Sequence, residues 1–280
     1  MTSRTLLRVA IITTFLWLGG VVAEAVAIVV APTAVHLSDR SPSAAITLYN
    51  PSTDPEEVSV ETVFGYPTTG EEGGVLLHLD PESTDPRSAA GWIQALPRRL
   101  VVPPGERRVV RLLARPPAGT PEGEYWTRLV LTSRGQSIPV RGTPDTAQVQ
   151  VGLDLEVRTI IALTYRKGPV TTSLTVDDFA PEIRGDTLVL RPDLVRGREG
   201  AYIGRMEVLL LDGDGAEVGS WSEQVAVYRA YHRRLAYDVS DLPPGVYRVV
   251  LRLSTDRDDV PPEARLQTTP LELTAEVVKQ

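Results

Sequence analysis

Three histidines are the residues of this chain best suited to metal binding or to acid–base chemistry. His36, His78 and His232 lie far apart in the sequence. None has the short spacing to a second histidine or a glutamate that zinc sites use. No G-x-S-x-G segment marks a nucleophilic serine, and no glycine-rich loop matches a phosphate site. The sequence therefore predicts neither an enzyme nor a bound cofactor.

An acidic run that begins at Asp212 is the second candidate for cation chemistry. It reads DGDG, and Glu223 stands twelfth from Asp212, as in a calcium-binding EF-hand loop. The intervening residues AEVGSWS have the pattern of a strand, however, so we expect a hairpin turn and no metal site.

A third kind of chemistry is recognition of another polypeptide through main-chain groups and apolar side chains. The segment 149–157 reads VQVGLDLEV and alternates apolar with polar or small residues, which predicts a strand with one apolar face. If one edge of that strand is unpaired, a partner's strand can add to it. The candidate partner-binding residues are Val149, Val151, Leu153, Leu155 and Val157. The alternative is that this row lines the interior of its own sandwich, with both edges paired.

Composition indicates the elements that position this strand. The 280 residues contain 23 prolines and 22 glycines that separate short apolar runs, a pattern typical of all-β proteins. A net charge of -7 argues against nucleic acid as a partner, because phosphate binding requires a basic surface. Cysteine is absent, which excludes disulfides and thiolate metal sites.

The first 27 residues have the form of a secretory signal peptide. Two arginines precede an apolar run at 9–22, and cleavage after Ala25 or Ala27 fits the small-residue rule equally well. The run is shorter than the ~20 residues that a membrane span needs. We therefore expect a periplasmic protein that contacts a membrane only during export.

Strand patterns divide the remaining chain into two immunoglobulin-like β-sandwich domains, residues 28–166 and 167–280. We expect Pro32 to make its strand an edge strand or one that changes partners. The first domain also contains a predicted long loop, 65–90, with at most a short strand at 75–79. Its other predicted strands are 28–37, 43–49, 57–64, 92–102, 107–114, 124–131 and 149–166.

The second domain is predicted from a similar series of apolar runs. Its expected strands are 172–176, 187–191, 205–211, 216–221, 224–228, 234–239, 245–254 and 271–278. The run from Pro243 to Tyr247 introduces a strand much as Gly123 to Tyr125 does in the first half, which suggests two sandwiches of related plan. Trp92, Trp126 and Trp221 are expected to fill the sandwich cores.

Several segments together resemble the N-terminal domain of periplasmic pilus chaperones, the PapD-like family. They are APTAVHL at 31–37, LPRRLVVPPGERRVVRLL at 96–113, EYWTRLVL at 124–131 and LDLEVRTIIALTYRKGP at 153–169. The resemblance covers residues 28–169. It implies that the last of these segments donates apolar side chains to a groove in an exported pilus subunit, with Leu153, Leu155 and Val157 at the matching positions.

One departure concerns the family's anchor for the carboxylate terminus of the subunit. The resemblance implies that family members bind this carboxylate with an arginine of the first strand and a lysine of the last strand. The matching positions in this chain are Ala34 and Ala162. Alanine supplies no charge-assisted hydrogen bond. Arg128 or Arg158 could replace the missing cations, although a lone arginine on a strand is usually solvated.

Two functional hypotheses follow. In the first, the protein is a periplasmic chaperone-like protein that binds an exported β-rich pilus or surface-fibre subunit by strand addition, with no nucleic acid or small-molecule cofactor. In the second, it is a structural or adhesive protein of the cell envelope with no client. An unpaired edge at 149–157 favours the first hypothesis, and an edge covered by residues 28–37 or by the loop 132–146 favours the second.

Overall fold

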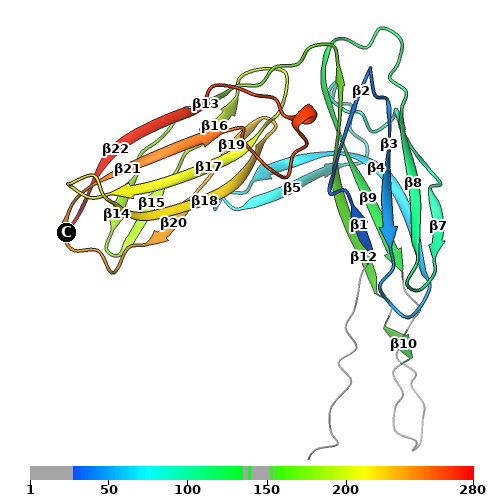
Figure 1. Cartoon of the computed structure of the whole chain (residues 1–280), viewed down its shortest axis with the longest axis horizontal. Helices are drawn as coiled ribbons and strands as arrows, with labels where there is room; N and C mark the ends of the chain where they lie inside the picture. The colour runs from blue at the N-terminus through cyan, green and yellow to red at the C-terminus, as the bar shows by residue number, and fades with distance from the viewer. Residues whose placement is uncertain (1–27, 135–137, 140–151, 154) are drawn as a thin grey trace, which may run out of the picture.

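The computed structural model describes residues 28–134, 138–139, 152–153 and 155–280. The predicted signal peptide at 1–27 lies outside these residues. The described part of the chain is built from β-strands and one short 3-10 helix, Pro262–Ala264. The all-β prediction is therefore confirmed, and Figure 1 shows two β-sandwiches set at an angle to each other.

Two sheets pack face to face in the first sandwich. One sheet has the order β1-β3-β8-β6, formed by Val29–Ala31, Ser43–Tyr49, Arg107–Ala114 and Ile93–Leu96. The other has the order β2-β12-β9-β4-β5, formed by Ala34–Ser38, Glu156–Lys167, Gly123–Arg134, Glu56–Thr69 and Val75–Asp80, with β7 (Arg99–Val102) also paired to β4. A small pair, β10 (Ile138–Pro139) and β11 (Gly152–Leu153), lies between β9 and β12 in the sequence.

Pro32 marks the point at which the first strand changes sheets. Before it, β1 pairs with β3 in one sheet, and after it, β2 pairs in parallel with β12 in the other. The peptide bond between Ala31 and Pro32 is cis. Because proline has no N–H to donate, it fits at such a break between two ladders. The predicted change of partner is confirmed.

The second sandwich contains a four-stranded sheet and two three-stranded sheets. The larger sheet has the order β18-β17-β21-β22, formed by Glu217–Val227, Tyr202–Leu211, Gly245–Ser254 and Leu271–Lys279. The smaller sheets are β14-β15-β20 (Glu182–Arg184, Thr187–Leu190, Leu235–Asp238) and β13-β16-β19 (Leu174–Val176, Asp193–Arg196, Ala230–His232).

The same tyrosine contact occurs in both sandwiches. The Tyr125 hydroxyl donates a hydrogen bond of 2.8 Å to the carbonyl of Pro121, and the Tyr247 hydroxyl donates one of 2.6 Å to the carbonyl of Pro243. A tyrosine that bonds a few residues upstream at the start of a strand is a feature of immunoglobulin-like folds. The two sandwiches therefore share a local plan, as the sequence echo suggested.

Some of the expected strand boundaries were wrong. The loop expected at 65–90 begins too early, because β4 runs to Thr69 and pairs with β5 in a long hairpin. The strand expected at 92–102 is two strands, β6 and β7, on different sheets, and the two runs expected at 216–228 form the single strand β18. The short strands β14, β16 and β19 were missed. Each is only three or four residues long, which is too short for alternation to be recognised in the sequence.

Each sandwich encloses its own apolar core, and a third cluster lies between them. Trp126 is fully buried in that third cluster with Phe64, Ala201 and Tyr228. Its expected place in a sandwich core was therefore wrong. Trp126 follows Tyr125 on β9, so the two side chains point to opposite faces of the sheet, and only Tyr125 faces the core.

Candidate functional site

Strand β12 has one edge that is only partly paired. Its other edge pairs with β9 in antiparallel register from Glu156 to Lys167. On the side away from β9, β2 pairs only with Ala162 to Arg166. Within the described residues, no strand pairs that side of β12 from Glu156 to Ile161. About half of the strand thus has main-chain groups available to a partner.

The alternation of β12 decides which side chains accompany this free edge. Ile161, Leu163 and Tyr165 are buried in the core of the first sandwich. Ile160 lies on the opposite face, where 37% of its surface is exposed. The free edge therefore carries an apolar side chain on the outer face of its sheet.

The five candidate binding residues fall in or just before this strand. Leu155 is 51% exposed and immediately precedes β12, while Val157 is half-buried. Leu153 lies in β11, where its backbone pairs with Ile138. Val149 and Val151 lie outside the described residues. The expectation of one uninterrupted strand was wrong, because Leu155 separates β11 from β12.

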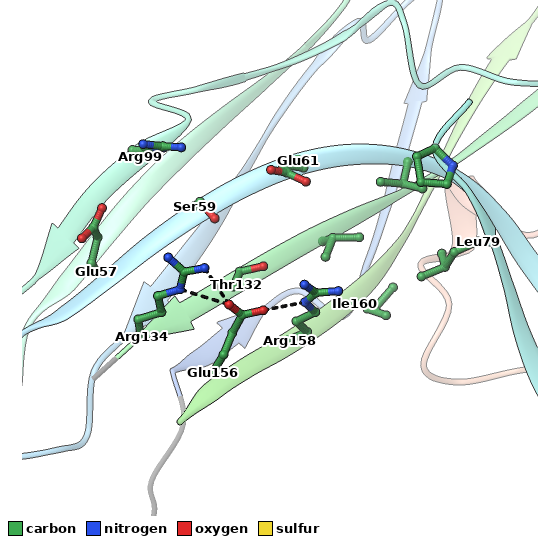
Figure 2. Close-up of a pocket in the computed structure, with 13 residues that line it drawn as sticks. Glu57, Ser59, Glu61, Leu79, Arg99, Thr132, Arg134, Glu156, Arg158 and Ile160 are labelled. Carbon is green, nitrogen blue, oxygen red and sulfur yellow. Dashed lines mark hydrogen bonds and ion pairs between the residues drawn. The ribbon is translucent and has the colours of Figure 1, made fainter. Parts of the chain in front are cut away.

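A charged cluster lies on the outer face beside the start of β12. Glu156 accepts hydrogen bonds from Arg134 Nε and Nη2 at 3.0 and 2.7 Å, and from Arg158 Nε at 2.8 Å (Figure 2). The hydrogen bonds from these two guanidinium groups lower the pKa of the Glu156 carboxyl. The carboxyl is solvent-exposed, so we interpret this cluster as a hydrated, charged border of the strand edge and not as a catalytic group.

An apolar strip continues from the free edge across the same face. A groove on the outer side of the sheet is lined by Ile160 of β12, Val130 of β9, Val63 of β4 and Leu79 of β5. Figure 2 shows Ile160 and Leu79 at one end of this groove and Glu57, Arg134 and Glu156 toward the other. The outer face is therefore apolar toward the second sandwich and charged away from it.

The two alanines at the expected anchor positions are neighbours. Ala34 of β2 is in register with Ala162 of β12, which is in turn in register with Arg128 of β9. Neither alanine can supply a cation. The expectation that Arg128 is solvated was wrong: it is 4% exposed, and its guanidinium lies 5.1 Å from the ring centre of Tyr228. Arg158 is exposed and pairs with Glu156.

A buried carboxylate joins the site to the second sandwich. Glu124 of β9 is 1% exposed and accepts hydrogen bonds from Arg166 Nε at 2.7 Å, Trp126 Nε1 at 2.9 Å and the backbone N–H of Ala201 at 2.8 Å. Arg166 also donates to the carbonyl of Ala264 at 2.6 Å. The sequence analysis missed this network. The signal in the sequence was Glu124 at the start of an otherwise apolar run, together with Arg166 at the end of another apolar run. These two residues are in register in the structure.

The three histidines make separate contacts. His36 shares a hydrogen bond of 2.9 Å with Thr164, His78 lies beside the Tyr66 ring with centroids 5.1 Å apart, and His232 pairs with Asp193 at 2.7 Å. No group of three or more potential metal-ligating side chains occurs within the described ranges.

Comparison with solved structures finds chaperones of pili and fimbriae. The chain is similar to the E. coli chaperone DraB, at 17% identity and a TM-score of 0.42 over 88% of this chain and 95% of that one. It is also similar to a CsuC–CsuE chaperone and tip adhesion subunit complex from Acinetobacter baumannii, at 12% identity and a TM-score of 0.42 over 90% and 98% of the two chains. A third is the SafB chaperone complex with SafA pilin from Salmonella enterica, at 12% identity and a TM-score of 0.42 over 89% and 96%.

No family model and no curated protein matches the chain. No helix in the described part of the chain has the length and composition of a membrane span. We base the functional proposal on the geometry of the β12 edge.

Proposed function

We propose that this protein is an exported, periplasmic chaperone-like protein that binds a β-rich exported subunit, of pilus or surface-fibre type, by strand addition. The binding segment is 149–157 together with the free edge of β12. One observation carries the proposal: Glu156 to Ile161 pairs with β9 on one side, and no strand within the described residues pairs the other side.

Apolar side chains beside this edge support the same proposal. Leu155 is 51% exposed, and Val157, two residues further on and on the same face, is half-buried. Ile160 is 37% exposed on the opposite face. Unpaired main-chain groups provide affinity in strand addition, and the alternating side chains provide specificity. The partner is therefore an extended segment whose own sheet or groove accepts an apolar row.

The pairing of β2 favours the second candidate function. Because β2 covers Ala162 to Arg166, the edge is closed next to the second sandwich. Ala34 and Ala162 also provide no cation for the end of a partner's chain. A partly closed edge without an anchoring cation is sufficient for a structural or adhesive envelope protein that has no client.

Co-expression with exported fibre subunits encoded beside its gene separates the two functions. The wild-type chain is expected to purify with one of them and to protect it from protease. The double substitution Leu153→Asp and Leu155→Asp is expected to reduce the recovered subunit at least about tenfold, because a carboxylate opposite an apolar pocket costs more than 1.4 kcal/mol.

The matched control is Val246→Asp, an exposed valine on β21 of the second sandwich. It is expected to recover as much subunit as the wild type. Equal recovery with the double variant, or no subunit recovered with the wild type, would favour the scaffold function.

A further inference from the structure

Strand β5 is a second unpartnered edge, at the opposite end of the sheet from β12. The sheet order β2-β12-β9-β4-β5 ends on β5, which pairs only with β4 among the described strands. Figure 1 shows the β4–β5 hairpin extending from the first sandwich toward β18 of the second. One long sheet thus has available main-chain groups at both ends.

Four of the six side chains of β5 are apolar and exposed, and they lie on both faces of the strand. The exposed fractions are 55% for Val75, 56% for Leu76, 43% for Leu77 and 36% for Leu79. Natural edge strands are usually protected by lysine, proline or a bulge. Val75–Asp80 contains no lysine or proline, and its register with β4 is continuous. An exposed apolar edge without these protections is a site at which another strand can add.

The hairpin is held in place by the second sandwich. The backbone N–H of His232 donates to Thr69 Oγ1 at 3.0 Å, and Arg233 donates to the carbonyl of Gly73 in the turn. Arg233 is itself fixed by two hydrogen bonds to Glu223, at 2.9 and 2.7 Å. A rigid edge loses little conformational entropy when a strand is added, which favours binding.

Charge at the two ends of β5 decides which occupant fits. Glu71 and Glu72 precede the strand, and Asp80 and Glu82 end and follow it. Arg234 lies 3.4 Å from Glu72, whose side chain remains 89% exposed. In an antiparallel pair, a second copy would place Glu72 near Asp80 and Glu82, and in a parallel pair, near another Glu72. Like charges beside each other destabilise either arrangement.

We propose that β5 binds an extended apolar segment of a different polypeptide, flanked by lysine or arginine, as an added edge strand. The apolar middle of the segment covers Val75, Leu77 and Leu79, and its basic flanks meet the acidic ends of the strand. This site does not depend on the function proposed for β12, and both ends of the sheet can be occupied at once.

The test uses two fluorescently labelled synthetic peptides, KKVTVTVKK and EEVTVTVEE, with the purified full chain. Anisotropy is expected to show at least about tenfold tighter binding of the basic peptide, and this binding weakens as salt rises, since the flanking charges are exposed. Hydrogen exchange of residues 75–80 is expected to slow when the basic peptide is added.

Val75→Lys is the decisive variant and Val246→Lys its control, because both valines are 55% exposed. The first is expected to weaken binding about tenfold or more, and the second less than about twofold. Leu155→Asp is expected to retain binding, which separates this site from β12. Circular dichroism checks that each variant is folded.

Three results would overturn the proposal. Equal binding of the two peptides would remove the role of charge, and full binding by Val75→Lys would place the peptide elsewhere. If light scattering detects a dimer of the wild type and only a monomer of Val75→Lys, the occupant of β5 is a second copy of this chain.

Discussion

Single residues determine how firmly β2 covers the edge of β12. We call the parallel pairing of β2 with Ala162–Arg166 of β12 the seam. His36 of β2 bonds Thr164 of β12, and its Nε2 is buried without a hydrogen-bond partner among the described atoms. Burial, followed by the positive charge of Arg166, lowers the pKa of His36 below its ordinary value of 6.5. Glu124 and Glu263 oppose this shift. The folded protein therefore holds a neutral imidazole at this seam.

Acid is expected to weaken the seam. Because the folded-state pKa of His36 is lowered, the unfolded chain takes up a proton first as pH falls below 6.5. The contribution of His36 to stability is thus complete above that pH and decreases as pH falls toward the folded-state pKa. Urea unfolding at pH 7.5 and at pH 5 is expected to show a smaller acid loss for His36→Gln than for the wild type. The same loss in both proteins would contradict this.

At the scale of elements, the sheet of the first sandwich has a covered middle and two exposed ends. Strand β9 is paired on both sides over most of its length, with β12 along the whole strand and with β4 at Arg128–Arg134, whereas β12 and β5 each pair fully on one side only. Strand β2 pairs with Ala162–Arg166 and not with Glu156–Ile161, and this pairing is what makes the two segments differ in edge coverage. The same strand therefore contains both a protected and an available segment.

Amide hydrogen exchange is expected to reveal this division within β12. Amides of 157–161 that point away from β9 are expected to exchange at least about tenfold faster than those of 163–166, because only the latter all have strand partners. NMR exchange rates measured residue by residue provide the check. Uniform protection from 157 to 166 would mean that another part of the chain covers the edge.

At the scale of the whole molecule, the junction between the sandwiches is built from buried charge and aromatic rings. Glu124 accepts from Arg166, Trp126 and the backbone of Ala201, and the Trp126 and Tyr228 rings pack with centroids 5.0 Å apart. The hydrogen bond from Ala201 crosses the junction, as does the one from Arg166 to the carbonyl of Ala264. The Glu124–Arg166 pair therefore links the first sandwich to the second through two main-chain groups, beside the packed rings.

Removing that carboxylate is expected to destabilise the junction. Glu124→Ala leaves Arg166 without its buried partner, which costs about 3–5 kcal/mol of unfolding free energy. Glu272→Ala, which removes an exposed pair with Arg252, is the control and is expected to cost less than about 1 kcal/mol. Urea unfolding followed by tryptophan fluorescence measures both. Equal losses of unfolding free energy in the two variants would show that the Glu124 network contributes no more than an exposed ion pair.

Local pattern alone determined much of the fold. The strands expected at 43–49, 107–114 and 245–254 have those bounds in the structure. The turn at Asp212 is also confirmed, with Asp212 Oδ1 accepting from the N–H groups of Asp214 and Ala216. Alternation and turn residues act over a few neighbours, so the sequence is sufficient to predict such elements.

Only the tertiary structure decided which edges and faces are available. The exposure of β5, the burial of Arg128 against Tyr228 and the half-covered edge of β12 all depend on strands far apart in the sequence. Ala34 lies beside Ala162 although 127 positions separate them. Because strand pairing is non-local, a period of two indicates that a strand has an apolar face but not what lies against it.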